Sequence, residues 1–123
     1  MADKKVVFIA FASEDVRQRD FLTAQSLLTK VPFDYIDSGV DVSDDPAWKE
    51  RVSSCIRGSD GVIALVSSHS LTSSRQQWEI ICAREEGKKI LGIWVYSNDR
   101  TALAGVNSVV WTWGDIRTFV EGL

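Results

Sequence analysis

Apolar residues fill two short stretches of the chain almost without interruption, at residues 6–11 and 61–66. A strand that is apolar on both faces is typical of the centre of a parallel sheet, because helices cover it from both sides. Residues 33–36 instead alternate between polar and apolar side chains, which predicts a strand at the edge of the sheet. Two further apolar runs, at residues 90–95 and 109–111, predict the fourth and fifth strands.

Helical spacing of apolar residues predicts a helix after each of the first two strands. The first helix begins in the turn at residues 12–15 and runs to about Leu28. The second begins at Pro46, with Asp45 as its N-cap, and ends at Gly58. The residues predicted to face the core are Phe21, Ala24 and Leu28 in the first helix and Trp48, Val52, Cys55 and Ile56 in the second.

A third helix is predicted after the second apolar strand, where Ser74 and Gln77 fit a capping box. Glu79 then lies in the second turn, near the positive end of the helix, and its neighbours on the helix surface are Cys82 and Ala83. A carboxylate among small side chains at this place is a candidate functional group. The alternative is a solvated glutamate whose charge only favours the start of the helix.

Strands that alternate with helices predict right-handed crossovers and a parallel sheet. With the two apolar strands in the middle and the alternating strand outside, the strand order is 2-1-3-4-5. This is a flavodoxin-like α/β fold with three layers, and its switch point lies between the first and third strands. Residues 13–15 and 67–70 are expected to meet there, and the start of the helix that carries Glu79 completes the cleft. A last small helix is expected at residues 115–121.

Length, charge and cysteine content narrow the function classes. The 123 residues, of which 45% are hydrophobic, predict one domain over residues 1–123. The net charge is −3 and no basic cluster exceeds a pair of lysines, so neither nucleic acid nor membrane is an expected partner. Cys55 and Cys82 lack metal-ligand spacing and are expected to be reduced core residues of a cytoplasmic protein.

Several kinds of chemistry lack the residues that they need. Glu14 and Asp15 follow the first strand and would repel phosphate, so no flavin or nucleotide-phosphate cradle is expected there. The single His69 has no partner at ligand spacing, and no G-x-S-x-G motif supports a serine nucleophile. Cleavage of the N-glycosidic bond of NAD needs fewer catalytic groups, because nicotinamide leaves as a neutral molecule and no acid has to protonate it. Only the cationic ribose must be stabilised, by a carboxylate such as Glu79.

Several segments of the chain together resemble the TIR-like domains of the Thoeris antiphage defence type. The segments that carry the resemblance are residues 7–15, 48–59, 62–67, 78–83, 86–90 and 110–113. They cover almost the whole chain, and their combination in this order is more specific than any one of them. The resemblance implies a flavodoxin-like fold and a domain that hydrolyses or cyclises NAD, with a catalytic glutamate on the helix after the third strand. The matching residue is Glu79.

The resemblance also bears on the other site residues. The first strand of the family commonly ends in tyrosine where this chain has Phe11, and the family's first loop matches residues 13–15. In this hypothesis Glu79 is catalytic, and the residues that contact the substrate are Phe11, Ser13, Asp15, Ser67, Ser68 and His69. NAD is the substrate, and neither a cofactor nor a metal ion is expected.

The family often works as assemblies, so self-association is expected, with residues 37–45 of one copy completing the site of a neighbour. A phage-derived trigger is a further expected partner, and the product is an ADP-ribose-type signal that is linear or cyclic. Two alternatives stay open at this point. One is a non-catalytic TIR-type interaction module, and the other is glycosyl transfer of the kind that nucleoside deoxyribosyltransferases perform.

Overall fold

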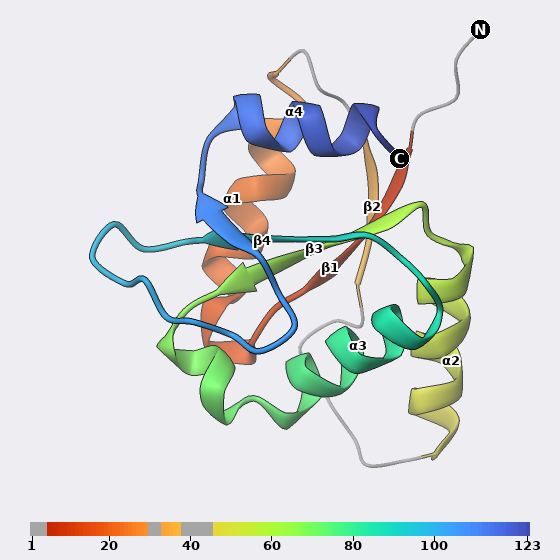
Figure 1. The fold of residues 1–123 in the computed structure, drawn as a ribbon. Coiled ribbons are helices and arrows are strands. Elements are labelled where there is room, and N and C mark those ends of the chain that lie inside the picture. The colour runs from red at the N-terminus through yellow and green to blue at the C-terminus, as the bar shows by residue number, and fades with distance from the viewer. Residues whose placement is uncertain (1–4, 30–32, 38–45) are drawn as a thin grey trace, which may run out of the picture.

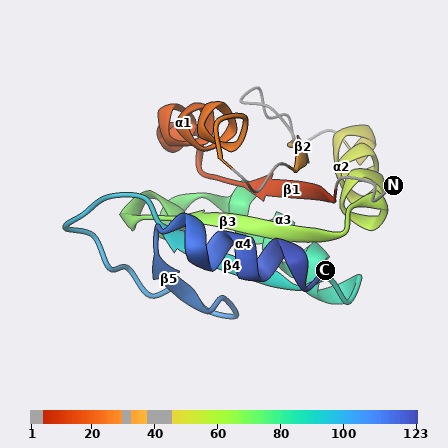
Figure 2. The same ribbon diagram turned by 90° about the horizontal axis from the view of Figure 1, so that it is seen from above.

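Five parallel strands form one sheet in this computed structural model, which describes residues 5–29, 33–37 and 46–123. The strands are β1 (Val6–Ala10), β2 (Asp34–Ile36), β3 (Gly61–Val66), β4 (Ile90–Trp94) and β5 (Ser108–Val110). Their order is β2-β1-β3-β4-β5, and Figure 2 shows them side by side in this order. The predicted α/β fold and strand order are confirmed.

Helices cover both faces of the sheet, so the fold has three layers (Figure 1). They are α1 (Val16–Ser26), α2 (Pro46–Gly58), α3 (Ser74–Glu85) and α4 (Trp113–Glu121), and two short 3-10 helices, η1 (Ser13–Asp15) and η2 (Ser68–Thr72), follow β1 and β3. The predicted N-cap of α2, Asp45, lies outside the described residues. No helix in the described part of the chain is long and apolar enough to cross a bilayer.

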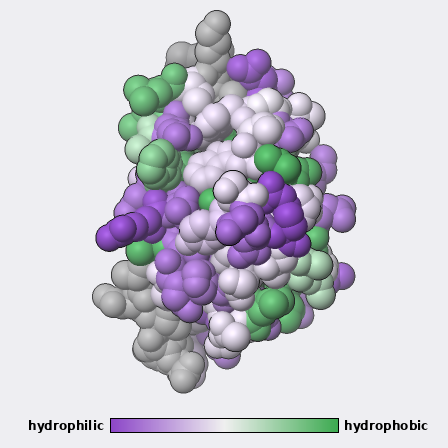
Figure 3. All heavy atoms as spheres, turned by 90° about the vertical axis from the view of Figure 1, so that its left-hand side faces the viewer, coloured by the Kyte–Doolittle hydropathy of each residue, from purple (hydrophilic) through white to green (hydrophobic). Residues whose placement is uncertain are grey.

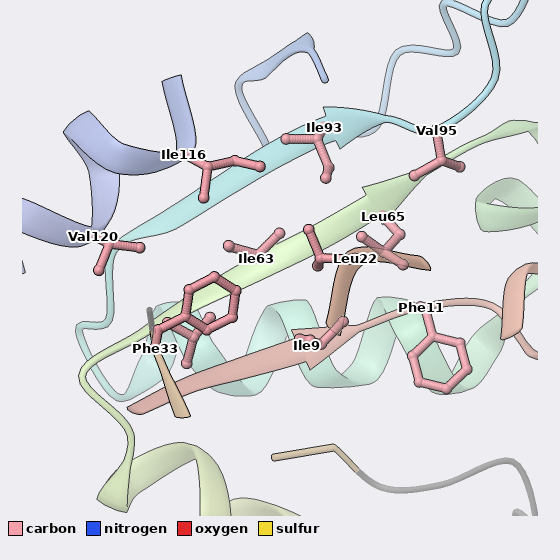
Figure 4. Close-up of a cluster of buried hydrophobic side chains, with 11 residues drawn as sticks. Ile9, Phe11, Leu22, Phe33, Ile63, Leu65, Ile93, Val95, Ile116 and Val120 are labelled. Atoms are coloured by element: carbon pink, nitrogen blue, oxygen red, sulfur yellow. The ribbon is translucent and has the colours of Figure 1, made fainter. Parts of the chain in front are cut away.

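The two faces of the sheet carry separate hydrophobic clusters because successive strand residues point to opposite sides. Figure 4 shows one cluster, in which Ile9, Ile63 and Ile93 of adjacent strands meet Leu22 of α1 and Ile116 of α4. On the other face the strands pack against α2 and α3; the buried residues there are Phe8, Ala10, Trp48, Val52, Ile56, Val62, Ala64, Val66, Ile80, Cys82 and Ala83. β1 and β3 are buried along both faces, as the two apolar runs predict.

The predicted core face of α1 is wrong. Phe21 is 58% exposed and Leu28, which lies beyond the end of the helix, is 88% exposed. The buried positions are Leu22, Thr23 and Ser26. The hydroxyls of Thr23 and Ser26 donate to carbonyls within α1, so these side chains enter the core with their hydrogen bonds satisfied. Figure 3 views the molecule from the left-hand side of Figure 1, where the strands end, and hydrophobic side chains on this side form separate groups among hydrophilic ones.

A second correction concerns Cys55 of α2, which was predicted to be in the core and is exposed. At about 100° per residue, Cys55 lies about 60° around the helix from Val52, whereas Trp48 and Ile56 lie about 40° from it. The buried stripe is narrow enough to hold Trp48, Val52 and Ile56 and to exclude Cys55. Cys82 is buried as predicted, and both thiols are free.

Replacing Trp48 with alanine is expected to lower the free energy of unfolding by about 3 kcal/mol, because it leaves a cavity between α2 and α3. Trp48 is 6% exposed, and its ring lies 5.6 Å from that of Trp78, centroid to centroid. Denaturant unfolding measures the change. The control is Tyr35→Ala, which removes a 44% exposed aromatic ring from β2 and should cost less than about 1 kcal/mol. A Trp48→Ala midpoint equal to that of the parent would show that this ring does not support the core.

Candidate functional site

A buried carboxylate, Asp15, lies at the carboxyl edge of the sheet and joins the ends of three strands. Asp15 is 0% exposed and accepts hydrogen bonds from the Ser67 hydroxyl at 2.5 Å and the Tyr96 hydroxyl at 2.7 Å. Its Oδ1 also lies 2.9 Å from Nδ1 of His69. These residues follow β1, β3 and β4, and we call Asp15, Ser67, His69 and Tyr96 the Asp15 cluster. The predicted meeting of residues 13–15 with residues 67–70 is confirmed at Asp15.

Local sequence explains why η2 holds His69 in this position. Ser67 is the N-cap of η2, and its hydroxyl accepts from the backbone N–H of His69 at 3.1 Å. The Ser70 hydroxyl in turn accepts from the backbone N–H of Ser67, which completes a capping box. Beneath it, the Gln76 amide donates to the carbonyls of Ala10 and Leu65 and so ties the ends of β1 and β3 together. The loop therefore has a defined geometry.

Hydrogen bonding to Asp15 changes the acid–base behaviour of both ring partners. The pKa of His69 is raised, first by its hydrogen bond to Asp15 and further by the charges of Asp15, Glu14 and Asp99. Burial, followed by the hydrogen bond to Asp15, raises the pKa of Tyr96 to about 12. Tyr96 is therefore a neutral hydrogen-bond donor at physiological pH. His69 is the half-exposed member of the cluster, with 41% of its side chain exposed.

Glu79 lies in the second turn of α3, as predicted, and is 1% exposed. The N-cap is Ser73 rather than the predicted Ser74, since the Ser73 hydroxyl accepts from the backbone N–H of Gln76. The two neighbours expected on the helix surface, Cys82 and Ala83, are also buried. The carboxylate is thus placed in the turn expected from the sequence, but it is closed to solvent, which the pattern did not predict.

A buried arginine, which the sequence pattern did not predict, accompanies Glu79. Arg75 is 6% exposed, and its guanidinium donates to the Phe11 carbonyl at 2.6 Å and lies 4.6 Å from the centroid of the Phe11 ring. Desolvation lowers the pKa of Arg75, and the charge of Glu79 acts in the opposite direction. The spacing of four residues between Arg75 and Glu79 is the signal that could have revealed the pair, because such residues share one helix face.

A second guanidinium lies near the same aromatic ring. Arg19 of α1 is 5.1 Å from the Phe11 centroid and forms an ion pair of 2.6 Å with Asp37, which follows β2. Phe11 is 0% exposed, so in this structure it is a core residue that two cations contact. The surroundings of Phe11 and Glu79 therefore contain both signs of charge, with little contact with water.

The remaining predicted contact residues lie at the surface. Ser13 of η1 is exposed, and Ser68 is exposed with its backbone N–H donating to Asp99 at 2.8 Å. The structure therefore brings Asp15, Ser67 and His69 into one cluster and leaves Ser13 and Ser68 outside it. Within the described ranges no group of three or more His, Cys, Asp or Glu side chains is placed to hold a metal ion.

The site as a whole combines a buried carboxylate on α3 with a hydrogen-bonded cluster at the switch point between β1 and β3. A model of the family described as the TIR-like domain of Thoeris protein ThsB matches residues 8–100 of the chain. The matched region begins in β1 and continues past β4, so it contains both Glu79 and the Asp15 cluster. A search of curated proteins found no match.

Proposed function

The chain belongs to the family of TIR-like domains of Thoeris protein ThsB, and from this premise we propose that it cleaves the N-glycosidic bond of NAD. The products are nicotinamide and an ADP-ribose-type signal, linear or cyclic, in antiphage defence. A cytoplasmic location is part of the proposal. The observation that carries it is Glu79, a carboxylate in the second turn of the helix after β3, near the carboxyl edge of a flavodoxin-like sheet.

The proposed chemistry needs one anion. When the bond between the ribose and the nicotinamide nitrogen breaks, its electron pair stays on that nitrogen, and the cationic ring becomes neutral nicotinamide. Positive charge then develops on the ribose, and a fixed carboxylate stabilises it best where water is excluded. Glu79 has such surroundings, since it is 1% exposed and shares its helix face with the small, buried side chains of Cys82 and Ala83. Water or another group of the dinucleotide then captures the ribose.

The same burial implies that the protein as described is a resting state. A dinucleotide cannot reach a carboxylate that is 1% exposed, so cleavage requires a rearrangement around α3. The proposed partners are a second copy of the chain and a phage-derived trigger. Both would act by stabilising the open arrangement. Residues 38–45, most of the segment expected to complete a neighbour's site, lie outside the described residues.

The purified protein should release nicotinamide from NAD when a phage-derived trigger is present, and its activity per molecule should rise with protein concentration. Release is measured by chromatography over a thousandfold range of dilution, with and without extract of phage-infected cells, and the oligomeric state is followed by light scattering. Activity per molecule that stays constant while the protein remains monomeric would argue against control by assembly. No nicotinamide under any of these conditions would argue against the enzyme.

The burial of Glu79 also favours a second candidate function. In this second function the enclosed Glu79 beside Arg75 holds α3 in place, and the domain is a TIR-type interaction module without catalytic activity. The nicotinamide assay distinguishes the two functions. In the second case, binding of a protein partner would be the only measurable activity.

A further inference from the structure

The imidazole of His69 has one nitrogen held inside the protein and one directed away from it. Nδ1 lies 2.9 Å from the buried Asp15 carboxylate and 3.3 Å from the Ser67 hydroxyl. Because the two ring nitrogens diverge, Nε2 faces away from Asp15. In the part of the chain that the structure describes, Nε2 has no hydrogen-bond partner, and 41% of the side chain is exposed. Such a fixed and accessible ring nitrogen is suited to bind a ligand group.

The position of His69 supports a role in binding. Asp15 follows β1 and His69 follows β3, so the pair spans the switch point of the sheet. In open α/β sheets, ligands bind outside the carboxyl ends of the strands at this point. The geometry of the pair is fixed on both sides, by the Ser67 and Tyr96 hydroxyls that bind the same carboxylate and by the capping box that begins η2.

The charges around His69 determine which ligand group fits. Asp15, Glu14 and Asp99 all act on the imidazole, so an anionic phosphate would meet three carboxylates there. The hydrogen bond to Asp15, together with these charges, raises the pKa of His69 and so favours its protonated form. A neutral imidazole accepts at Nε2 and an imidazolium donates there. A hydroxyl can serve either state because it is both donor and acceptor.

We propose that Nε2 of His69 binds a sugar hydroxyl of a nucleotide and that in NAD this is the ribose of the adenosine half. The assignment to NAD rests on the proposed function. His69 lies in η2 with 41% of its side chain exposed, whereas Glu79 lies inside α3 and is 1% exposed. We therefore assign the two groups to different riboses of the substrate. A dinucleotide has two, so the nicotinamide ribose belongs at Glu79 and the other at His69.

Because His69 is the single histidine of the chain, its ring signals are unambiguous in NMR spectra. The full chain is titrated with ADP and with 2′,3′-dideoxyadenosine diphosphate, which differ only in the ribose hydroxyls. We expect ADP to shift the His69 ring signals and to bind about tenfold more tightly, as one hydrogen bond predicts. His69→Phe should remove this preference. The control is Thr72→Val, which removes a hydrogen bond to the His69 carbonyl without touching the imidazole, and it should keep the preference.

Equal affinity for the two nucleotides, no binding of either, or the same loss in Thr72→Val as in His69→Phe would overturn the proposal. The test is independent of bond cleavage, since neither nucleotide contains nicotinamide. NAD cleavage by a protein that shows no hydroxyl preference would refute the His69 site alone. A hydroxyl preference that depends on His69 in a protein that never releases nicotinamide would refute the proposed function and leave the site standing.

Discussion

Replacing Glu79 with glutamine is expected to reduce nicotinamide release from NAD by about three orders of magnitude. The substitution keeps the shape of the side chain and its capacity for hydrogen bonds but removes the negative charge that stabilises the cationic ribose, and charge stabilisation of this kind commonly accounts for such a factor. Affinity for NAD should change much less, because the positive charge of uncleaved NAD lies on the nicotinamide ring and develops on the ribose only as the bond breaks. Release by the triggered protein, measured by chromatography, gives the rate, and calorimetric titration gives the affinity.

The matched control is Glu85→Gln, which removes one negative charge from an exposed position of the same helix. It should release nicotinamide at the rate of the parent, and both variants should show the circular dichroism of a folded protein. If triggered Glu79→Gln is as fast as the parent, the proposed mechanism is wrong. If neither protein ever releases nicotinamide, the interaction module becomes the better description of the domain.

The arrangement of the sheet could be predicted from the pattern of apolar and polar residues in its strands. Residues 6–11 and 61–66 are apolar on both faces, which only central parallel strands require, and residues 33–36 alternate, as an edge strand does. With right-handed crossovers, these conditions place β2 outside β1 and β1 beside β3, as observed. The same order places Asp15 beside Ser67 and His69, so this part of the site follows from topology.

Packing of α1 could not be predicted in this way. Its buried face contains Thr23 and Ser26, whose hydroxyls bond to carbonyls of their own helix, while Phe21 is left exposed. A hydropathy pattern assigns such residues to the wrong side, because it counts the hydroxyl as polar regardless of its partner. The N-cap of α3 could not be predicted for a similar reason. Ser73 and Ser74 are both acceptable N-caps, and only the hydrogen bond from the Gln76 backbone N–H to the Ser73 hydroxyl distinguishes them.

The burial of Glu79 and Arg75 likewise depends on tertiary contacts. A glutamate and an arginine four residues apart on a helix are usually an exposed pair on its surface. Here the helix face that holds them turns toward the end of β1, where the Phe11 carbonyl and ring receive the guanidinium. The sequence contains both residues at the right spacing, but nothing in the local pattern shows which surface covers them.

Arg75→Met is expected to lower the free energy of unfolding by about 4 kcal/mol, more than any other single change considered above. Methionine keeps the apolar stem, so the loss comes from the guanidinium group. The variant removes both the donor to the Phe11 carbonyl and the cation that acts on the buried Glu79. Removal of one partner of a buried charge pair commonly costs this much, because the other charge stays buried without compensation. Denaturant unfolding measures the loss. Arg84→Met, at an exposed position of the same helix, should change stability by less than about 0.5 kcal/mol.

A double-mutant cycle separates the charge pair from the rest of this loss. In a Glu79→Gln background the buried anion is gone, so Arg75→Met should cost at least about 1.5 kcal/mol less than it does in the parent. The remaining cost then belongs to the Phe11 carbonyl and to the packing of the guanidinium on the ring. Equal costs of Arg75→Met in the two backgrounds would mean that Arg75 and Glu79 are not coupled. The arginine would then stabilise the end of β1, and the enclosed carboxylate would be held in place by other contacts.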